Sequence, residues 1–392
     1  MPGRSKEILT LPRYTPLMTQ RLVHLVAAAR PNFMKVAPLW HALRASPDFT
    51  PILVHSGQHY DPNMSDAFFE DLRLPRPDHH LGIGSGSHAE QTGGVMIAYE
   101  KVAMAERPDW LVVVGDVNTT AACAMVAAKL HIPLVHLEAG LRSRDRLMPE
   151  EANRLVTDVL SDVLWTPSPD ADENLRAEGV EAERITRVGN IMLDSFELVR
   201  PTIEAADRPG KLGLTRGNYG VVTLHRPSNV DEPGELARLV AALVKVQETL
   251  PLVFPVHPRT RVRLADAGHD SRLAAAGVQL VEPLSYVEFM SLVASSAAAI
   301  TDSGGVQEET TYLGIPCLTL RRNTERPITI DEGTNRLVTA ETLLPSLTCA
   351  LATPPTQRRR PDLWDGRTAA RCVADLRRRS LARENIADLA AE

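Results

Sequence analysis

The sequence predicts an α/β protein made of two domains, each built on a doubly wound parallel sheet. The first observation is that short apolar, β-branched runs alternate with helical patterns along most of the 392 residues, as in βαβ units. The second is a polar, Pro- and Gly-rich break near Pro201, after which a second series of runs begins. The third is a glycine turn directly after a run of the second series, where such sheets bind ligands. Both halves are therefore Rossmann-like.

The first half carries five apolar runs, and the segments between them have helical patterns. Strands are expected at residues 22–27, 51–55, 110–114, 133–137 and 163–166. Helices are expected at about 34–45, 88–106, 118–130, 149–160 and 170–178.

The second half repeats the pattern, with a helix at 306–313 after the glycine turn. Its strands are expected at 219–224, 252–256, 278–281, 297–301 and 316–320. The predicted organisation is a mobile tail at 1–20, a first domain at 21–200, a second domain at 201–366, and a closing helix at 367–392 that packs back on the first domain.

Composition narrows the class of protein. Apolar residues make up 44% and charged residues 23%, which is typical of a soluble globular chain, and a net charge of −6 argues against general nucleic-acid binding. No apolar run reaches the ~18 residues of a membrane span, and residues 1–20 lack the apolar core of a signal peptide. The four cysteines have no C-x-x-C spacing, so we expect reduced, buried thiols in a cytoplasmic protein without a metal site.

The glycine turn lies in A-A-A-I-T-D-S-G-G-V-Q-E-E, residues 297–309. Ser303 is expected as a helix N-cap, and Gly304 and Gly305 let the backbone approach a ligand closely. The free N–H groups and dipole of such a helix start bind anions, so a diphosphate is expected there, with Glu308 and Glu309 near the hydroxyls of a ribose. The alternative is an ordinary strand–turn–helix corner with a well-capped helix.

Charged residues also follow the strands of the first half. Arg30 and Lys35 come after the first strand and suit an anionic or phosphorylated substrate, unless they are solvated surface charges. Asp116 follows the third strand, either as a helix N-cap or as a catalytic carboxylate. Glu138 follows the fourth, where small neighbours leave room for a ligand. H-x-E at 136–138 begins a zinc deaminase signature, but no P-C-x-x-C follows, so we reject a metal.

Glu150 and His225 are weaker candidates when taken alone. Acids in the first turn of a helix are explained by the helix dipole, which accounts for Glu150. A lone histidine is structural by default, although His225 stands at a strand end beside Arg226 and could reach phosphates.

One glycine-rich segment does not indicate a dinucleotide cofactor. G-S-G-S at 84–87 has the spacing of the dinucleotide fingerprint, but D-H-H-L before it is no buried strand. We interpret it as a loop in which Ser87 caps the next helix. No cofactor is expected.

In this order the motifs resemble those of the non-hydrolysing UDP-N-acetylglucosamine 2-epimerases, across roughly residues 22–337. The matching blocks are A-R-P-N-F-M-K (29–35), G-Q-H (57–59), G-D-x-N-T-T (115–120), H-L-E-A-G-L-R (136–142), P-E-E-A-N-R (149–154), T-L-H-R-P (223–227), D-S-G-G-V-Q-E-E (302–309) and T-E-R-P (324–327). Any one block is a weak signal, but eight in the right order are specific. The resemblance implies the GT-B fold of nucleotide-sugar glycosyltransferases, a homodimer, and an active site in the interdomain cleft.

The resemblance also implies roles for individual residues. The catalytic residues would be Asp116, Glu138, Glu150 and His225. The substrate-binding residues would be Arg30, Lys35, Arg142, Leu284, Phe289, Ser303, Gly304, Gly305, Glu309 and Arg326. An allosteric role for substrate near Gln58 and His59 stays open. The chain departs from many members at Asn32 and Leu284, where they have Glu and Gln, which bears on sugar and base preference and not on the fold.

The implied reaction interconverts UDP-N-acetylglucosamine and UDP-N-acetylmannosamine by eliminating UDP to a 2-acetamidoglucal and adding it back. One alternative is a hydrolysing epimerase, which releases free N-acetylmannosamine and UDP. Another is a GT-B glycosyltransferase that uses a UDP-sugar. A third is a catalytically silent nucleotide-sugar sensor, against which the three carboxylates argue because a binding module does not need them.

Overall fold

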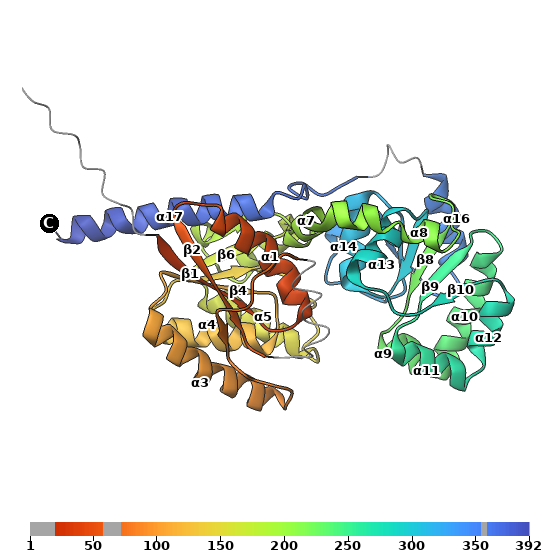
Figure 1. The fold of residues 1–392 in the computed structure, drawn as a ribbon, viewed down its shortest axis with the longest axis horizontal. Coiled ribbons are helices and arrows are strands. Elements are labelled where there is room, and N and C mark those ends of the chain that lie inside the picture. Colours follow the sequence, from red (N-terminus) through yellow and green to blue (C-terminus); the bar gives the residue numbers. More distant parts are fainter. Residues whose placement is uncertain (1–19, 58–71, 354–358, 392) are drawn as a thin grey trace, which may run out of the picture.

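Two parallel sheets form the framework of the protein (Figure 1). The computed structural model describes residues 20–57, 72–353 and 359–391. A seven-stranded sheet has the order β3-β2-β1-β4-β5-β6-β7, and a six-stranded sheet has the order β10-β9-β8-β11-β12-β13. We call the parts built on them the first and the second domain. The predicted fold class is confirmed.

The first domain contains the five predicted strands, each within two residues of its expected bounds. Its strands are β1 (Arg21–Ala27), β2 (Phe49–His55), β3 (His79–His80), β4 (Trp110–Val114), β5 (Leu134–Leu137), β6 (Val163–Thr166) and β7 (Ile185–Arg187). Its helices are α1 (Arg30–Arg44), α3 (His88–Glu106), α4 (Asn118–Leu130), α5 (Pro149–Leu160) and α6 (Pro169–Ala177), with a short 3₁₀ turn η1 (Ala182–Arg184). Ser87 caps α3 as predicted, since its side chain accepts from the Glu90 N–H.

The second domain also contains its five predicted strands. Its strands are β8 (Gly220–Thr223), β9 (Leu252–Pro255), β10 (Gln279–Val281), β11 (Ala298–Thr301), β12 (Cys317–Thr319) and β13 (Asn335–Leu337). Its helices are α9 (Pro227–Val230), α10 (Pro233–Gln247), α11 (Pro258–Asp266), α12 (His269–Ala275), α13 (Tyr286–Ala294), α14 (Gly304–Leu313), α15 (Ile328–Asp331) and α16 (Leu343–Ala352).

The segment at 201–211, predicted to be a linker, is helical instead. Helix α7 (Ile191–Ala206) continues through Pro201, and α8 (Arg208–Lys211) follows after Asp207, whose φ of 37° turns the chain between them. Apolar side chains of α7 are buried on both sides of Pro201, and the helix packs on α1 of the first domain and on α13 and α14 of the second. This packing outweighs the helix-breaking tendency of proline, on which the prediction relied.

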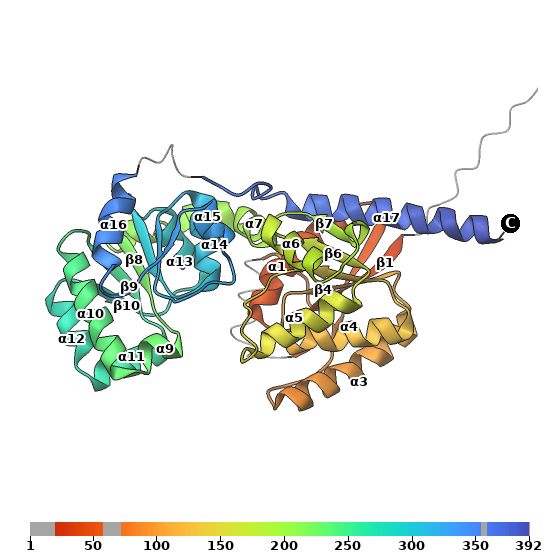
Figure 2. The same ribbon diagram turned by 180° about the vertical axis from the view of Figure 1, so that it is seen from behind.

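Helix α17 (Thr368–Ala391) runs back along the first domain (Figures 1 and 2). Two indole N–H groups of the first sheet donate to it, from Trp165 to Asp375 at 2.8 Å and from Trp110 to Ser380 at 2.9 Å. α1, α7 and α17 lie on one face of that sheet, and α3, α4 and α5 cover the other. The end of the chain thus completes a layer of the first domain.

Within the described ranges, no helix is both long and apolar enough to cross a membrane. All four cysteines are free thiols, but only Cys123, Cys317 and Cys372 are buried. Cys349 is exposed, contrary to the prediction, because it lies on the outer face of α16.

The pairing register of the parallel strands brings candidate site residues to the same edge of each sheet. β4 and β5 are paired parallel strands with Val114 opposite Leu137, so Asp116 and Glu138 leave the first sheet at the same edge. β8 and β11 are paired with Thr223 opposite Thr301, which likewise brings the segments after Thr223 and Thr301 together.

Candidate active site

A chain of four charged side chains links the two domains. Glu138 of the first domain accepts from Lys35 through Oε2 and from Arg326 Nη2 through Oε1, the latter at 3.1 Å. Arg326 also donates through Nε to Glu308 of the second domain at 2.6 Å. We call Lys35, Glu138, Arg326 and Glu308 the interdomain ion-pair chain. Lys35, Glu138 and Arg326 were singled out from the sequence as site residues, whereas Glu308 was expected near ribose hydroxyls and bonds Arg326 in the structure.

The position of Glu138 depends on an unusual turn after β5. Its φ is 74°, a left-handed conformation that costs a residue with a Cβ about 1 kcal/mol or more. Gly140 follows with a φ of 79°, and a Cβ there would come within 2.4 Å of the Ala171 carbonyl oxygen. The small residues after Glu138 allow this turn, which directs the Glu138 carboxylate at Lys35 and Arg326.

The ion-pair chain keeps Glu138 ionised. Burial by itself raises the pKa of this carboxyl, but the charges of Lys35 and Arg326 outweigh burial and lower it. Burial raises the pKa of Glu308, because it outweighs the charges of Arg326, its ion-pair partner, and of Lys35. The arrangement therefore supplies one deprotonated carboxylate, which can act as a base toward a substrate that displaces a cation.

The Asp116 carboxylate is bonded by a side chain of α5 and does not cap α4, the helix that follows it. Arg154 donates to Asp116 Oδ2 through Nε at 3.0 Å and through Nη2 at 2.6 Å. The N-cap of α4 is Val117, so the alternative that Asp116 is a helix N-cap is wrong. The Asp116 side chain is 31% exposed, which leaves its second oxygen available to a ligand.

The two acids at the start of α5 face different surroundings. Glu151 is buried and accepts from the Ser143 N–H at 2.9 Å, the Ser143 hydroxyl at 2.8 Å and Arg154 Nη1 at 2.8 Å. Glu150 is half-buried, and none of the residues in the described ranges forms a hydrogen bond or ion pair with its carboxylate. Glu151 and Arg154 are therefore supports that the sequence did not indicate, and Glu150 remains free for substrate.

The glycine turn has the features of an anion site. Ser303 is the N-cap of α14 as predicted, but its side chain makes no capping hydrogen bond. Apart from the adjacent residues and the backbone of the helix itself, no atom lies within 4 Å of a Cβ built on Gly304 or Gly305, so the space beside these glycines is open. The first N–H groups of an α-helix have no partner in the helix, and here they remain available to a ligand. The alternative of a well-capped corner is not supported.

His225 lies beside this turn and contacts the buried carboxylate of Asp302. Its Nδ1 lies 2.9 Å from Asp302 Oδ1, and Asp302 is completely buried. In the sequence, Asp302 directly follows the strand expected at 297–301, and no role was predicted for it. A carboxylate directly after a fully buried parallel strand was the signal that could have revealed it.

Glu309 of α14 contacts α13. The Tyr286 hydroxyl donates to Glu309 Oε1 at 2.8 Å, and Leu284 and Phe289 are half-buried nearby, before and within α13. Burial raises the pKa of Glu309 from an ordinary 4.5 to about 8. Neighbouring Glu308 and Glu309 thus serve different partners, Arg326 and Tyr286.

We expect this buried acid to make stability depend on pH. Because Glu309 has a pKa of about 8 when folded and 4.5 ordinarily, the folded state binds the extra proton between these values. Its contribution is complete below pH 4.5 and is lost as pH rises through about 8, by on the order of a few kcal/mol.

Glu309→Gln, which resembles the protonated acid, should therefore flatten the decline in unfolding free energy between pH 5 and 8, as measured by urea titration of the ligand-free protein. Glu248→Gln on the exposed end of α10 is the matched control. Parallel pH curves for wild type and Glu309→Gln would contradict the assignment.

Arg142 is not part of the interdomain ion-pair chain. It is buried, and its guanidinium contacts Glu178 at 2.6 Å and Asp158 at 2.8 Å. Arg30 begins α1. Gln58 and His59 lie outside the described residues.

His136, in the H-x-E motif, is a structural histidine. Its Nδ1 contacts Asp158 at 2.6 Å and its Nε2 contacts the Gly115 carbonyl oxygen at 2.8 Å. Residues 20–57, 72–353 and 359–391 contain no group of three or more His, Cys, Asp or Glu side chains placed to hold a metal ion.

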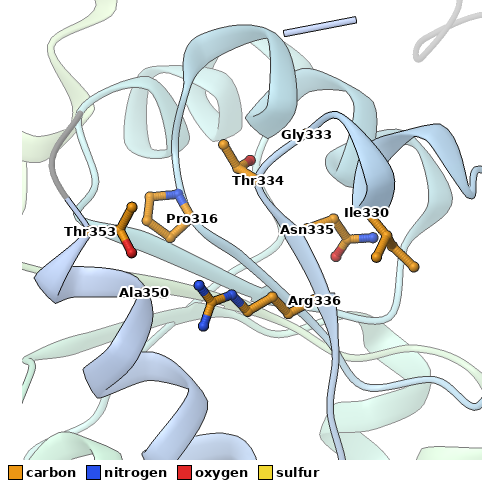
Figure 3. Close-up of a pocket in the computed structure, with 8 residues that line it drawn as sticks. All are labelled: Pro316, Ile330, Gly333, Thr334, Asn335, Arg336, Ala350 and Thr353. Atoms are coloured by element: carbon orange, nitrogen blue, oxygen red, sulfur yellow. The ribbon is translucent and has the colours of Figure 1, made fainter. Parts of the chain in front are cut away.

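A cavity of about 320 Å³ in the second domain is separate from the site (Figure 3). It is lined by Pro316 and Thr334, which directly precede β12 and β13, together with residues such as Arg336 and Thr353. It therefore lies at the amino-terminal edge of the sheet, opposite the glycine turn.

Comparison with known proteins identifies the family. The family model described as UDP-N-acetylglucosamine 2-epimerase matches residues 41–377. A Methanocaldococcus jannaschii protein named UDP-N-acetylglucosamine 2-epimerase is 41% identical over 323 residues, covering 80% of this chain and 87% of the relative. A Pseudomonas aeruginosa protein named UDP-2,3-diacetamido-2,3-dideoxy-D-glucuronate 2-epimerase is 40% identical over 321 residues, with the same coverage of 80% and 87%.

Solved structures extend the similarity to the arrangement of both domains. The Methanocaldococcus jannaschii UDP-GlcNAc 2-epimerase, in complex with UDP-GlcNAc and UDP, superposes with a TM-score of 0.79 at 38% identity over 91% of this chain and 99% of that one. The Neisseria meningitidis UDP-GlcNAc 2-epimerase bound to UDP-GlcNAc gives a TM-score of 0.80 at 27% identity over 91% and 100%. The fold is the GT-B arrangement, and the chain belongs to the UDP-N-acetylglucosamine 2-epimerase family.

Proposed function

We propose that this protein interconverts UDP-N-acetylglucosamine and UDP-N-acetylmannosamine by non-hydrolytic epimerisation at C2. The observation that carries the proposal is the interdomain ion-pair chain. It sets an ionised carboxylate of the first domain, Glu138, against Arg326 and Glu308 of the domain that holds the open helix start at Gly304. The two relatives crystallised with UDP-GlcNAc support the choice of substrate.

The chemistry requires two functions from the site. The C2 proton has no adjacent carbonyl to acidify it, so its loss is coupled to cleavage of the C1–O bond. The C2–H electrons form the C1=C2 double bond of a 2-acetamidoglucal, and UDP leaves with the C1–O electrons. UDP then adds back to C1 while C2 takes a proton on its opposite face.

Each function matches a part of the site. The N–H groups at Gly304 and Gly305, with His225, Lys35 and Arg326, would hold the departing diphosphate by preorganised electrostatics. Asp116, Glu138 and Glu150 would supply the acid and the base for the two faces of C2. In our proposal Glu309 binds the ribose, and Leu284 and Phe289 border the uracil.

Incubation with UDP-N-acetylglucosamine in D₂O tests this function. NMR should show deuterium at C2 of both nucleotide sugars as they approach a mixture of two intact epimers. UDP with free N-acetylmannosamine would identify a hydrolysing epimerase. Transfer to an acceptor without C2 exchange would identify a glycosyltransferase.

A diacetamido sugar acid is the second candidate substrate, because the Pseudomonas aeruginosa relative is as similar as those named for UDP-N-acetylglucosamine. Asn32 is among the departures from many members, but its side chain is buried and bonds the Val114 carbonyl oxygen and the Ala29 N–H, each at 3.1 Å. Comparing C2 exchange with both nucleotide sugars separates the candidates.

The proposal includes a homodimer joined through the first domain. α3 and α5 flank α4 and expose Ile97 (64%), Met104 (60%) and Val159 (71%), large apolar side chains that a monomer would leave in water. Combining Met104→Glu with Val159→Glu should convert the protein from twice the chain mass of 42.9 kDa to the chain mass, measured by sedimentation equilibrium.

Val262→Glu on α11 of the second domain, 58% exposed, is the control and should leave the mass unchanged. A wild-type chain that sediments as a monomer would contradict the homodimer.

Buried free thiols at Cys123, Cys317 and Cys372 support a reducing compartment. We therefore propose a cytoplasmic location.

A further inference from the structure

Asp302 joins the loop after β8 to the loop after β11. Its carboxylate accepts from the His225 N–H at 3.0 Å, the Arg226 N–H at 2.9 Å and Asn229 Nδ2 at 3.1 Å, all through Oδ2. Oδ1 lies 2.9 Å from His225 Nδ1. Since the side chain is completely buried, these contacts replace all of its hydration.

This arrangement fixes the imidazole of His225. An ionised carboxylate only accepts hydrogen bonds, so the nitrogen beside it must carry a hydrogen, which places the N–H of the neutral ring on Nδ1. The lowered pKa of Asp302, in which His225 and the backbone N–H groups outweigh burial, keeps the carboxylate ionised. The backbone donors also prevent the carboxylate from rotating away.

The other ring nitrogen, Nε2, remains available beside the anion site. His225 is 41% exposed, and no side chain in the part of the chain that the structure describes bonds its Nε2. Pairing of Thr223 with Thr301 sets the His225 loop next to Ser303 and the start of α14. A protonated ring would thus present the Nε2 hydrogen to a diphosphate held there.

No other charged group near the His225 ring competes with Asp302 for Nδ1 among the described residues. The His257 ring centroid is 5.8 Å away, from the loop after β9. The Arg226 side chain turns away, with Nε on the Asp302 carbonyl oxygen at 3.1 Å and Nη2 near Glu325 at 3.6 Å. Asp302 is the one carboxylate among the described residues in contact with His225.

We propose that Asp302 is a positioning residue for the reaction. It holds His225 with Nδ1–H on its own carboxylate, so that Nε2–H of the protonated ring donates a hydrogen bond to the β-phosphate as the C1–O bond breaks. This inference rests on the proposed function. It adds that the histidine is effective only in the tautomer and orientation that Asp302 imposes.

Asp302→Asn is the main test, because the amide keeps the shape but can donate to Nδ1 and reverse the tautomer. We expect kcat for C2 exchange to fall about 10²–10⁴-fold with little change in KM. Asn229→Ala is the matched control, since it removes a different contact of Asp302 and leaves the His225 pair intact.

Two further readouts separate positioning from a loss of structure. In ¹⁵N-histidine NMR, the His225 signal, assigned by its loss in His225→Gln, should report Nδ1–H in wild type and Nε2–H in Asp302→Asn. The double variant Asp302→Asn/His225→Gln should be no slower than His225→Gln alone, because Asp302 acts through the ring.

The outcomes distinguish the two proposals. Wild-type protein without C2 exchange would refute the function, whereas the tautomer can be measured regardless. Any of three results would overturn the role of Asp302. Asp302→Asn could turn over as fast as Asn229→Ala, or the His225 tautomer could be the same in Asp302→Asn as in wild type. The losses of kcat could also be additive in the double variant.

Discussion

Glu138→Gln is expected to abolish deuterium incorporation at C2 while the protein still binds UDP. Glu138 is the carboxylate that Lys35 and Arg326 keep ionised, so the change removes the group best prepared to act as a base. General acid–base assistance contributes about 10²–10⁴-fold, and kcat should fall by at least that factor. UDP affinity, measured by calorimetry, should be equal or higher because two cations lose an anionic partner.

Companion variants test the other carboxylates. Asp116→Asn and Glu150→Gln should also lose exchange and retain UDP binding, while Glu235→Gln, an acid of α10 paired with Arg238, should behave as wild type. Turnover that is unchanged in all three carboxylate variants would remove the catalytic assignment. Loss of UDP binding in any of them would instead indicate a structural role.

The strands were predictable where a run of apolar residues in the sequence marks a fully buried segment. β4 is a continuous apolar run, and β11 is apolar up to Ile300, a pattern that leaves little choice of structure. β3, with two residues, and β7, with three, carry no such pattern and are set by pairing with a neighbour. α7 was missed at Pro201 because its packing partners come from both domains, which no local window contains.

The site was predictable in its motifs but not in its pairings. Asp116 could be an N-cap or a catalytic acid, and only the N-cap of α4 at Val117 excluded the first alternative. Glu308 and Glu309 are adjacent in sequence, yet one bonds Arg326 and the other Tyr286. Such pairings depend on where distant segments meet, so they follow from tertiary structure and not from residue type.

Arg326→Met should destabilise the protein and abolish activity together. Arg326 is the only cation of the interdomain ion-pair chain that contacts carboxylates of both domains, Glu138 and Glu308. Its loss leaves Glu308 buried without a cation and Glu138 with Lys35 alone. Removing one partner of a buried ion pair typically costs about 3–5 kcal/mol, so we expect a loss of that order in the unfolding free energy.

The pH dependence of that loss identifies its cause. Without Arg326, both carboxylates should have folded pKa values above their unfolded ones, so the variant gains stability as pH falls and its deficit shrinks from pH 8 to pH 5. Arg326→Met/Glu308→Gln should recover part of the deficit, because one uncompensated charge is removed. Arg322→Met, on the same loop but exposed, is the control. An equal deficit at both pH values would mean that packing, and not charge, holds the two domains together at this point, and the ion-pair chain would then have no part in keeping Glu138 ready for catalysis.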